Sequence, residues 1–598
     1  MDASNEVSLY QSYASVAQKL NIAGWDDDQA DIKQLVKRCV VEISARHCLL
    51  IFDNTEHITL QSSGSSTTEA ADLANCLPQS KLCSVIFTTT NTDTARALAP
   101  QNIISLRELT LDAALKMLQV RLARPLANTE QQEAEHLLRA LSYLPLAVMQ
   151  AAACTKASGM TVQEYRSRLD DHKKLAIEHS GDLSEGKLQG AGVKDPVAAT
   201  LFLSIYEIRR DNALAADYLF LVACVERKDI SLDLLEAASP QAREDAIRVL
   251  DKQRCQQASQ AGLILIDCRS QTILWDVPLC TSLYIVYKYA LVTRRPAESA
   301  LDVHRLVHRA LRKQLQAQGL KQWTQCTITQ LLRVFPDDNH SNRSKWRRLL
   351  PHAQYALSHS QMNEDDNERL HLAWKCAMTL HSDGRYEEAE ELFVQVMETR
   401  KTKLGADHPD TLTSIANLAS TYWNQGRWND AEKLNVQVME TRKTKLGAGH
   451  PSTLNSMANL ASTYRNQGRW DDAEKLEVQV METRKTKLGA DHPSTLNSMA
   501  NLALTYWNQG RWNDAEKLNV QVMETRKTKL GADHPSTLNS MHNLAFMLQS
   551  QARHVEALAL IEKCFQSRQQ VLGEQHPYTQ SSFDTLNSWR AECSDGNP

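Results

Sequence analysis

The chain has 598 residues, of which 42% are hydrophobic and 23% charged, as expected for a globular protein of several domains. Its 67 basic and 71 acidic residues nearly balance, so no polybasic surface indicates nucleic-acid binding, and no apolar run reaches the roughly 18 residues of a membrane helix. No secretory leader is evident, and the 13 cysteines form no C-x-x-C pair. We therefore expect a cytoplasmic protein with reduced thiols; a disulfide framework or a zinc site is the alternative.

The first strand-like segment lies at 48–51 and is followed by Phe52, Asp53 and Asn54. We expect a buried strand that ends in a carboxylate, which is the Walker B pattern in which an aspartate holds Mg²⁺. A second short strand is predicted at 84–87, before a run of threonines. Helical stretches separate such strands, which predicts a parallel α/β sheet. In the alternative interpretation, Asp53 is a strand-end carboxylate that caps the next turn.

The middle of the chain is apolar and mostly helical in its spacing. TLFLSIYEI and DYLFLVACV, within 200–225, predict helices. QAGLILIDC and TILWDV, within 260–277, predict short strands, so a winged-helix module is expected. Residues 321–370 are predicted to form a helical connector, whose basic cluster at 343–348 is too short to indicate nucleic-acid binding.

Four motifs in order give the first 315 residues a family resemblance. Besides the two strand-end segments, LSYLPLAVMQAAA surrounds Pro145, and DVHRLVHRALRKQL surrounds His304, with Val303 in the slot of a methionine. Residues 7–315 thereby resemble the NB-ARC nucleotide-binding core of NLR-type (STAND) receptors. The resemblance implies a nucleotide-binding remnant made of Asp53, Asn54, Thr88, Thr89, Pro145 and His304. For His304 a structural role at a helix start is the alternative.

The phosphate-binding loop of that family has no full match in this chain. Gly181, Gly186 and Lys187 have the right spacing, but Leu188 stands where a serine or threonine would reach Mg²⁺, and the segment follows a polar stretch. Thr90 also replaces the expected sensor arginine. In the family the loop lies upstream of the part that matches the start of this chain, so we expect either a degenerate domain or a truncated gene model. Without a phosphate cradle we expect no enzyme activity and no cofactor; ADP or ATP with Mg²⁺ would bind only if that loop were supplied.

The strongest pattern is a repeat of 42 residues. His-Pro recurs at His408, His450, His492, His534 and His576. Each unit predicts two helices, because proline suits a first turn and a glycine such as Gly426 suits a helix end. In the first full unit, apolar residues recur at helical spacing: Leu412, Ile415, Ala419 and Tyr422 in the first helix, then Trp428, Ala431, Leu434 and Val438 in the second. Trp428, Trp470 and Trp512 are accordingly predicted to lie in the core.

NLASTYWNQGRWNDAEKL and LGADHP resemble the tetratricopeptide repeats of kinesin light chains over about 371–590. The resemblance implies a solenoid of five repeats with a capping helix at 578–589, in which the first helices line a concave groove. We expect a polar stripe on those helices to face the groove: Asp410, Ser414, Asn417, Thr421 and Asn424, then Ser456, Asn459, Thr463 and Asn466, then Ser498, Asn501, Thr505 and Asn508, and finally Asn543. The alternative is a merely solvated helix face.

The ligand-binding residues predicted from this stripe are asparagines, whose amides both donate and accept hydrogen bonds. One slot varies between otherwise nearly identical units and is expected to tune what is bound, with drift after duplication as the alternative. The predicted peptide-binding set is Asn417, Asn424, Asn459, Asn466, Asn501, Asn508 and Asn543, with Trp423, Arg465 and Trp507 in the variable slot.

The predicted fold is mostly α: a truncated α/β domain (1–108), a helical domain (109–190), a winged-helix-like domain (191–320), a helical connector (321–370) and the solenoid (371–598). We expect an NB-ARC/tetratricopeptide receptor or scaffold, of the kind found in fungi, that binds a protein or peptide and has lost nucleotide switching. A plain tetratricopeptide adaptor and a nucleotide-binding switch with a missing loop are the alternatives, and homo-oligomerisation is left open. No catalytic constellation and no metal site are predicted.

Overall fold

The structure is a computed structural model. It describes residues 48–55, 83–99, 101–180, 196–236, 277–295, 299–360, 367–574 and 577–595, with ten scattered residues among the first 37. The chain divides into two compact units, which meet in sequence between Ser382 and Asp383, and each unit is described here by itself.

A small parallel sheet opens the first unit. β1 (Cys48–Phe52) pairs with β2 (Cys83–Phe87) in register, and α4 (Thr92–Leu98) follows. The predicted parallel pairing is confirmed. The expected full burial of β1 is wrong: Leu49 and Ile51 are 56% and 45% exposed, because alternate side chains face opposite sides and only the side of Phe52 meets a core cluster.

A helical layer follows the sheet. It consists of α5 (Leu111–Leu122), α6 (Asn128–Ala140), α7 (Pro145–Ser158), α8 (Val162–Ser180), α9 (Pro196–Asp211) and α10 (Ala213–Val222). α7 begins at a proline, packs against α5 and α9, and ends at Gly159, whose φ of 70° suits glycine. The two helices predicted within 200–225 are confirmed as α9 and α10.

The rest of the first unit combines a small antiparallel sheet with long helices. β3 (Ile230–Ser231), β5 (Ala300–Val303) and β4 (Val292–Arg295) form a sheet in that order, beside α11 (Leu232–Glu236) and α13 (Val277–Lys288). The strands predicted within 260–277 lie outside the described residues, except for Val277, which begins α13. α14 (Arg305–Val334) runs continuously through residue 320, and η2 (His340–Asn342), α15 (Arg343–His359) and α16 (Asn367–Ser382) follow.

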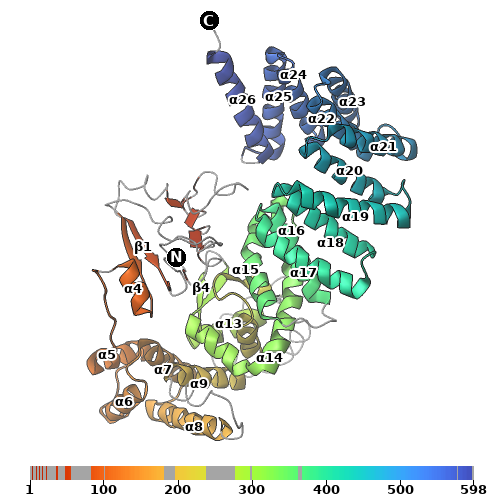
Figure 1. Cartoon of the computed structure of the whole chain (residues 1–598). Helices are drawn as coiled ribbons and strands as arrows, with labels where there is room; N and C mark the ends of the chain where they lie inside the picture. Colours follow the sequence, from red (N-terminus) through yellow and green to blue (C-terminus); the bar gives the residue numbers. More distant parts are fainter. Residues whose placement is uncertain are drawn as a thin grey trace, which may run out of the picture. The chain divides into compact units, whose positions relative to one another are not determined.

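The second unit is a row of helix pairs stacked in chain order (Figure 1). It begins with α17 (Tyr386–Leu404). The pairs are α18 (Pro409–Asn424) with α19 (Trp428–Leu446), α20 (Pro451–Asn466) with α21 (Trp470–Leu488), α22 (Pro493–Asn508) with α23 (Trp512–Leu530), and α24 (Pro535–Ser550) with α25 (His554–Leu572). α26 (Pro577–Asp595) packs against α25, which confirms the predicted terminal helix.

Local sequence explains where these helices start and stop. The histidine before each first helix is its N-cap: His408 Nδ1, for example, accepts a hydrogen bond of 3.2 Å from the Asp410 amide. Gly426, with φ of 76°, separates the two helices of that pair, and Gly447, with φ of 87°, ends the second. His408, His450, His492 and His534 are therefore structural caps.

The core of the solenoid lies between the helix pairs. Leu412, Ile415 and Ala419 are buried as predicted. The prediction for the tryptophans is wrong: Trp428, Trp470 and Trp512 are 38%, 40% and 45% exposed. Each is the first residue of its helix, and helical side chains lean toward the N-terminus, so these rings extend beyond the packed seam.

Candidate functional site

The structure brings several predicted remnant residues together at the carboxyl ends of β1 and β2. Thr88 Oγ1 donates a hydrogen bond of 2.6 Å to Asp53 Oδ1 and accepts one of 2.9 Å from the Asn54 amide. The Thr88 amide in turn bonds the Phe52 carbonyl at 2.9 Å. The carboxylate of Asp53 thus accepts a hydrogen bond from a hydroxyl that lies directly after the neighbouring strand.

Helix α14 contributes to the same cluster. Arg305 Nη1 donates to Asn54 Oδ1 at 2.5 Å, a contact across 251 residues that the sequence patterns did not signal. His304 caps α14, with Nδ1 accepting from the Leu306 amide at 3.3 Å. Burial, then the charge of Arg305, lowers the pKa of His304, and Asp53 partly offsets the change. His304 therefore favours its neutral form, in which one ring nitrogen can accept.

Two other remnant residues have local roles. The Thr89 hydroxyl accepts a hydrogen bond of 3.1 Å from the Asn91 amide, in the turn that leads into α4. Pro145 is the first residue of α7. Among the described residues, no group of three or more histidine, cysteine or acidic side chains could hold a metal ion.

The predicted polar stripe of the solenoid is only partly exposed. Of the predicted row, Asn459 is exposed, and Asn417, Asn501 and Asn543 are partly exposed. Ser414 and Thr421 are instead fully buried, as are their equivalents in the following repeats, so the expectation of one open stripe is wrong for these positions. Ser414 is buried because its hydroxyl joins neighbouring helices: it accepts from Arg400 Nη1 at 2.9 Å.

A second row of asparagines lies one helical turn before the predicted one and was missed by the sequence reasoning. Each amide oxygen accepts a hydrogen bond from an arginine 29 residues later, on the second helix of the same repeat. The three pairs are Asn455 with Arg484 at 2.6 Å, Asn497 with Arg526 at 2.5 Å and Asn539 with Arg568 at 2.6 Å. The recurring 29-residue offset was the available signal.

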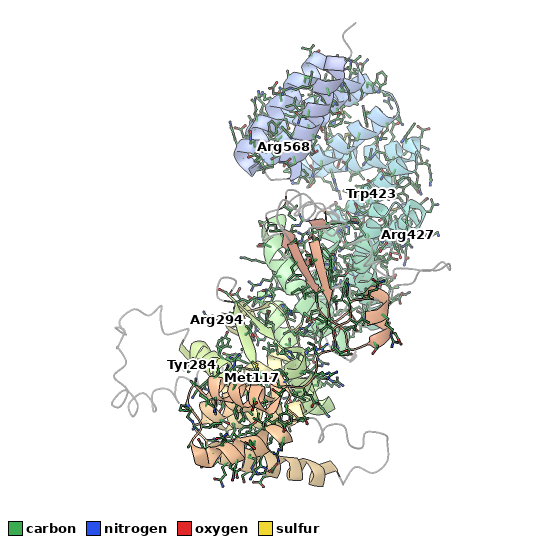
Figure 2. The ribbon with its side chains drawn as sticks, turned by 90° about the vertical axis from the view of Figure 1, so that its left-hand side faces the viewer. Met117, Tyr284, Arg294, Trp423, Arg427 and Arg568 are labelled. Carbon is green, nitrogen blue, oxygen red and sulfur yellow. The ribbon has the colours of Figure 1, made fainter. Side chains whose placement is uncertain are left out.

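Each of these arginines also reaches the next first helix. Nη1 of Arg484 donates to Ser498 Oγ at 2.9 Å, and Nη1 of Arg526 donates to Ser540 Oγ at 2.8 Å. Arg568, labelled in Figure 2 near the last helices, makes the same bond to Ser582 at 2.7 Å. One guanidinium therefore ties together three helices. We call each such set of arginine, asparagine and serine an arginine tie.

The arginine ties fix the direction of the asparagine amides. A guanidinium only donates hydrogen bonds, so each asparagine must turn its oxygen inward and its NH₂ group away. Arg484, Arg526 and Arg568 are only 8%, 8% and 3% exposed, and burial lowers the pKa of each guanidinium without removing its charge. The first helices at 451–466, 493–508 and 535–550 contain no aspartate or glutamate. The exposed amides thus form a row of donors backed by buried positive charge.

In one repeat the variable slot, which Trp423, Arg465 and Trp507 occupy in successive repeats, contacts a buried glutamate of the same repeat. Arg465 Nη1 lies 3.2 Å from Glu477 Oε1, and the two side chains are 14% and 3% exposed. Thr505 Oγ1 donates to Glu477 Oε2 at 2.6 Å. In the repeats on either side, tryptophan replaces Arg465 and asparagine replaces Glu477: Trp423 with Asn435, and Trp507 with Asn519.

The second of those tryptophans is also engaged within the solenoid. Trp507 Nε1 donates to Ser550 Oγ at 2.9 Å, and its ring packs against a buried cluster that includes Ala515 and Met547. The variation at this slot is therefore matched by variation at a buried position.

The described helices include none that combines the length and the apolarity needed to cross a bilayer.

Comparisons with known proteins agree with these patterns. The tetratricopeptide repeat model matches residues 369–444, 414–486, 453–528 and 494–570. A nucleotide-binding leucine-rich repeat (NLR)-like protein of Hyaloscypha variabilis is 33% identical over 428 residues, which cover 69% of this chain and 39% of that protein. The chain thus spans about two fifths of the length of that relative.

Two solved structures are also similar. Kinesin light chain nearly identical TPR-like repeats of Podosopora anserina share 32% identity with a TM-score of 0.30, covering 34% of this chain and 96% of that one. A STAND protein with a tetratricopeptide repeat sensor from Pyrococcus horikoshii shares 11% identity with a TM-score of 0.30, covering 99% and 85%. At such TM-scores the structural matches carry no weight, and the assignment depends on the repeat model and the sequence relative. The repeat model shows that residues 369–570 are tetratricopeptide repeats, and the sequence relative shows that the chain is similar to an NLR-like protein.

Proposed function

We propose that the chain is a non-catalytic receptor or scaffold of the cytoplasm, whose first helices α20, α22 and α24 bind an extended segment of a partner protein. The repeats and the NLR-like relative support an interaction role. The observation that carries the proposal is the set of arginine ties, which hold Asn455, Asn497 and Asn539 with their NH₂ groups turned outward.

The ligand chemistry follows from the two asparagine rows. A polypeptide main chain offers carbonyl acceptors whatever its side chains are, and the oriented NH₂ groups would donate to them. Asn459, Asn501 and Asn543 lie one turn further along the same helices and would accept main-chain N–H groups as well as donate. The rows would therefore hold an extended segment in place, while neighbouring side chains select its sequence.

Selectivity would come from a slot three residues after each asparagine of the predicted row, Asn417, Asn459, Asn501 and Asn543. Serine occupies it at 420 and 462, whereas Leu504 and Phe546 occupy it in the later repeats, and Phe546 is 37% exposed. We expect ligands that are polar toward the first repeats and carry an apolar side chain toward the last.

The test uses the full chain. A random peptide library is selected against it, and the best peptide is titrated against the triple variant Asn455→Ala, Asn497→Ala, Asn539→Ala. Each lost hydrogen bond costs about 1 kcal/mol, so affinity should fall roughly 100-fold. The exposed Asn513 on α23 supplies the control, since Asn513→Ala should leave the affinity unchanged. Unchanged binding by the triple variant, with its helical circular dichroism intact, would exclude this surface.

A second proposal concerns the strand-end cluster: nucleotide switching is lost. The Thr88 hydroxyl donates a hydrogen bond to the carboxylate of Asp53, and Thr90 stands where the sensor arginine is expected. We expect labelled ADP with Mg²⁺ to show no saturable binding to this chain at micromolar concentration. Saturable ADP binding that Asp53→Asn weakens would instead favour an intact switch. Peptide affinity that does not change when the first unit is altered would favour a plain adaptor.

A further inference from the structure

Two cysteines lie side by side at the start of the parallel sheet. Cys48 begins β1, Cys83 begins β2, and the two are register partners. Both pack against the same core cluster, which contains Tyr13 and Phe52, so their side chains share one face of the sheet. Adjacent strands lie about 4.8 Å apart, within the Cα separation of roughly 4.4–6.8 Å that disulfides span.

The surroundings allow chemistry at this pair. Both cysteines are free and only partly buried, whereas Cys154, Cys376 and Cys564 are buried within helices. Burial, and then the Cys48 side chain, raise the pKa of the Cys83 thiol above its usual value, which lowers its thiolate fraction and slows its attack without preventing it. The influence of Cys48 on Cys83 is consistent with thiols that face each other.

We propose that Cys48 and Cys83 form a reversible redox site, which a disulfide oxidant such as oxidised glutathione converts into a cross-strand disulfide. The Cys48 thiolate attacks the oxidant, forms a mixed disulfide and releases one glutathione thiolate. The Cys83 thiolate then attacks the Cys48 sulfur and releases the second. Two protein thiols are oxidised, and one oxidised glutathione is reduced to two glutathione molecules.

The position of the pair gives the cross-link a defined consequence. The hydrogen bond between Thr88 and Asp53 already joins the two strands at their ends, and the disulfide would join them at their starts. Neighbouring strands hold Cβ atoms further apart than the roughly 3.8 Å of a relaxed disulfide, so the bond would be strained and easily reduced. Such bonds are typical of regulatory rather than structural disulfides.

Mass spectrometry of the full chain tests the proposal. The protein is equilibrated in glutathione buffers of increasing oxidised fraction, alkylated and digested with trypsin. Cleavage after Arg46, Lys81 and Arg96 yields peptides 47–81 and 82–96, and we expect a disulfide between them that dithiothreitol removes. Cys76 shares the first peptide, so the measurement is repeated with Cys76→Ser, which should keep the cross-link, and with Cys48→Ser, which should abolish it.

One further control variant completes the test. Cys326 is exposed on α14, and Cys326→Ser should not change the cross-link. The proposal is overturned if Cys48 and Cys83 stay separately alkylated in the most oxidising buffer, or if each carries glutathione without progressing to the protein disulfide. Persistence of the cross-link in Cys48→Ser would assign it to Cys76 and overturn the proposal as well. None of these outcomes bears on peptide binding by the solenoid.

Discussion

Arg465 and Glu477 form a buried ion pair, and removing one partner should lower the stability of the helices that carry it. Arg465→Ala leaves a carboxylate that is 3% exposed with Thr505 as its remaining hydrogen-bond donor. Breaking one side of a buried ion pair costs about 3–5 kcal/mol, because the other charge stays desolvated and unpaired. We expect a loss of that size in the local stability of α20 and α21.

The neighbouring repeats supply the compensating change. Arg465→Trp combined with Glu477→Asn recreates the residues found one repeat earlier and one repeat later. The double variant should lie within about 1 kcal/mol of the wild type, which implies a coupling energy of at least about 2 kcal/mol between the two positions. Hydrogen exchange of the amides in α20, α21 and α22, measured on the full chain, reports the local opening free energy.

The reasoning has a clear point of failure. If Arg465→Ala costs less than about 1 kcal/mol, the pair is not effectively desolvated. If the double variant is as unstable as the worse single variant, the matched variation between repeats is coincidental, and the variable slot is free for ligand contact.

The same pair predicts a pH dependence. Burial raises the pKa of Glu477 above its unfolded value of 4.5, and the Thr505 hydroxyl and the Arg465 charge offset part of that rise. A raised folded-state pKa favours folding fully below the unfolded pKa, and this contribution is lost as the pH rises through the folded pKa. Relative to Glu477→Gln, the wild type should therefore gain local stability on acidification; a pH-independent difference would refute the assignment.

Three further predictions concern other parts of the solenoid. Burial, then the charge of Arg568, lowers the pKa of His542 to about 4. The stability that its neutral form supplies above pH 6.5 should therefore be lost as the pH drops toward 4. His542→Ala should remove this pH dependence from the hydrogen exchange of α24. In Arg484→Lys, the lysine cannot bridge the Asn455 amide and Ser498 together, so peptide affinity should fall roughly 10-fold while circular dichroism shows that the helices persist. An unchanged affinity would show that peptide binding does not depend on the orientation of Asn455. Arg469 lies 4.0 Å over the ring of Tyr464, and its exposed position limits the cost of Arg469→Ala to about 1 kcal/mol in local exchange; a cost several times larger would mean that the pair is shielded from solvent.

Much of the fold could be predicted, because the relevant forces act over short sequence distances. Periodicity, the proline after each histidine and the glycine between helices specify α18 to α25 almost to the residue. The prediction that Trp428 is buried is wrong for a local reason. Its spacing places it on the apolar face, but as the first residue of its helix it extends its ring beyond the packed interface between helices.

The candidate sites were less predictable, because they depend on contacts between distant segments. The link between Arg305 and Asn54 spans 251 residues and has no local pattern. The asparagine row at 455, 497 and 539 was visible in the sequence, yet only the structure pairs it with arginines. Burial of Ser414 likewise depends on a neighbouring helix, so helical spacing alone predicts a surface position for this buried polar residue.

The last arginine tie includes the terminal helix. Arg568, which donates a hydrogen bond to Asn539, also donates to the Tyr578 carbonyl at 2.8 Å and to Ser582, both of which belong to α26. The terminal helix thereby helps to orient an amide on α24. Deleting α26 would remove these hydrogen bonds and would also take Leu586 and Trp589 out of the core cluster that they share with α24 and α25, so the terminal helix supports both the orientation of this amide and the packing of the last repeat.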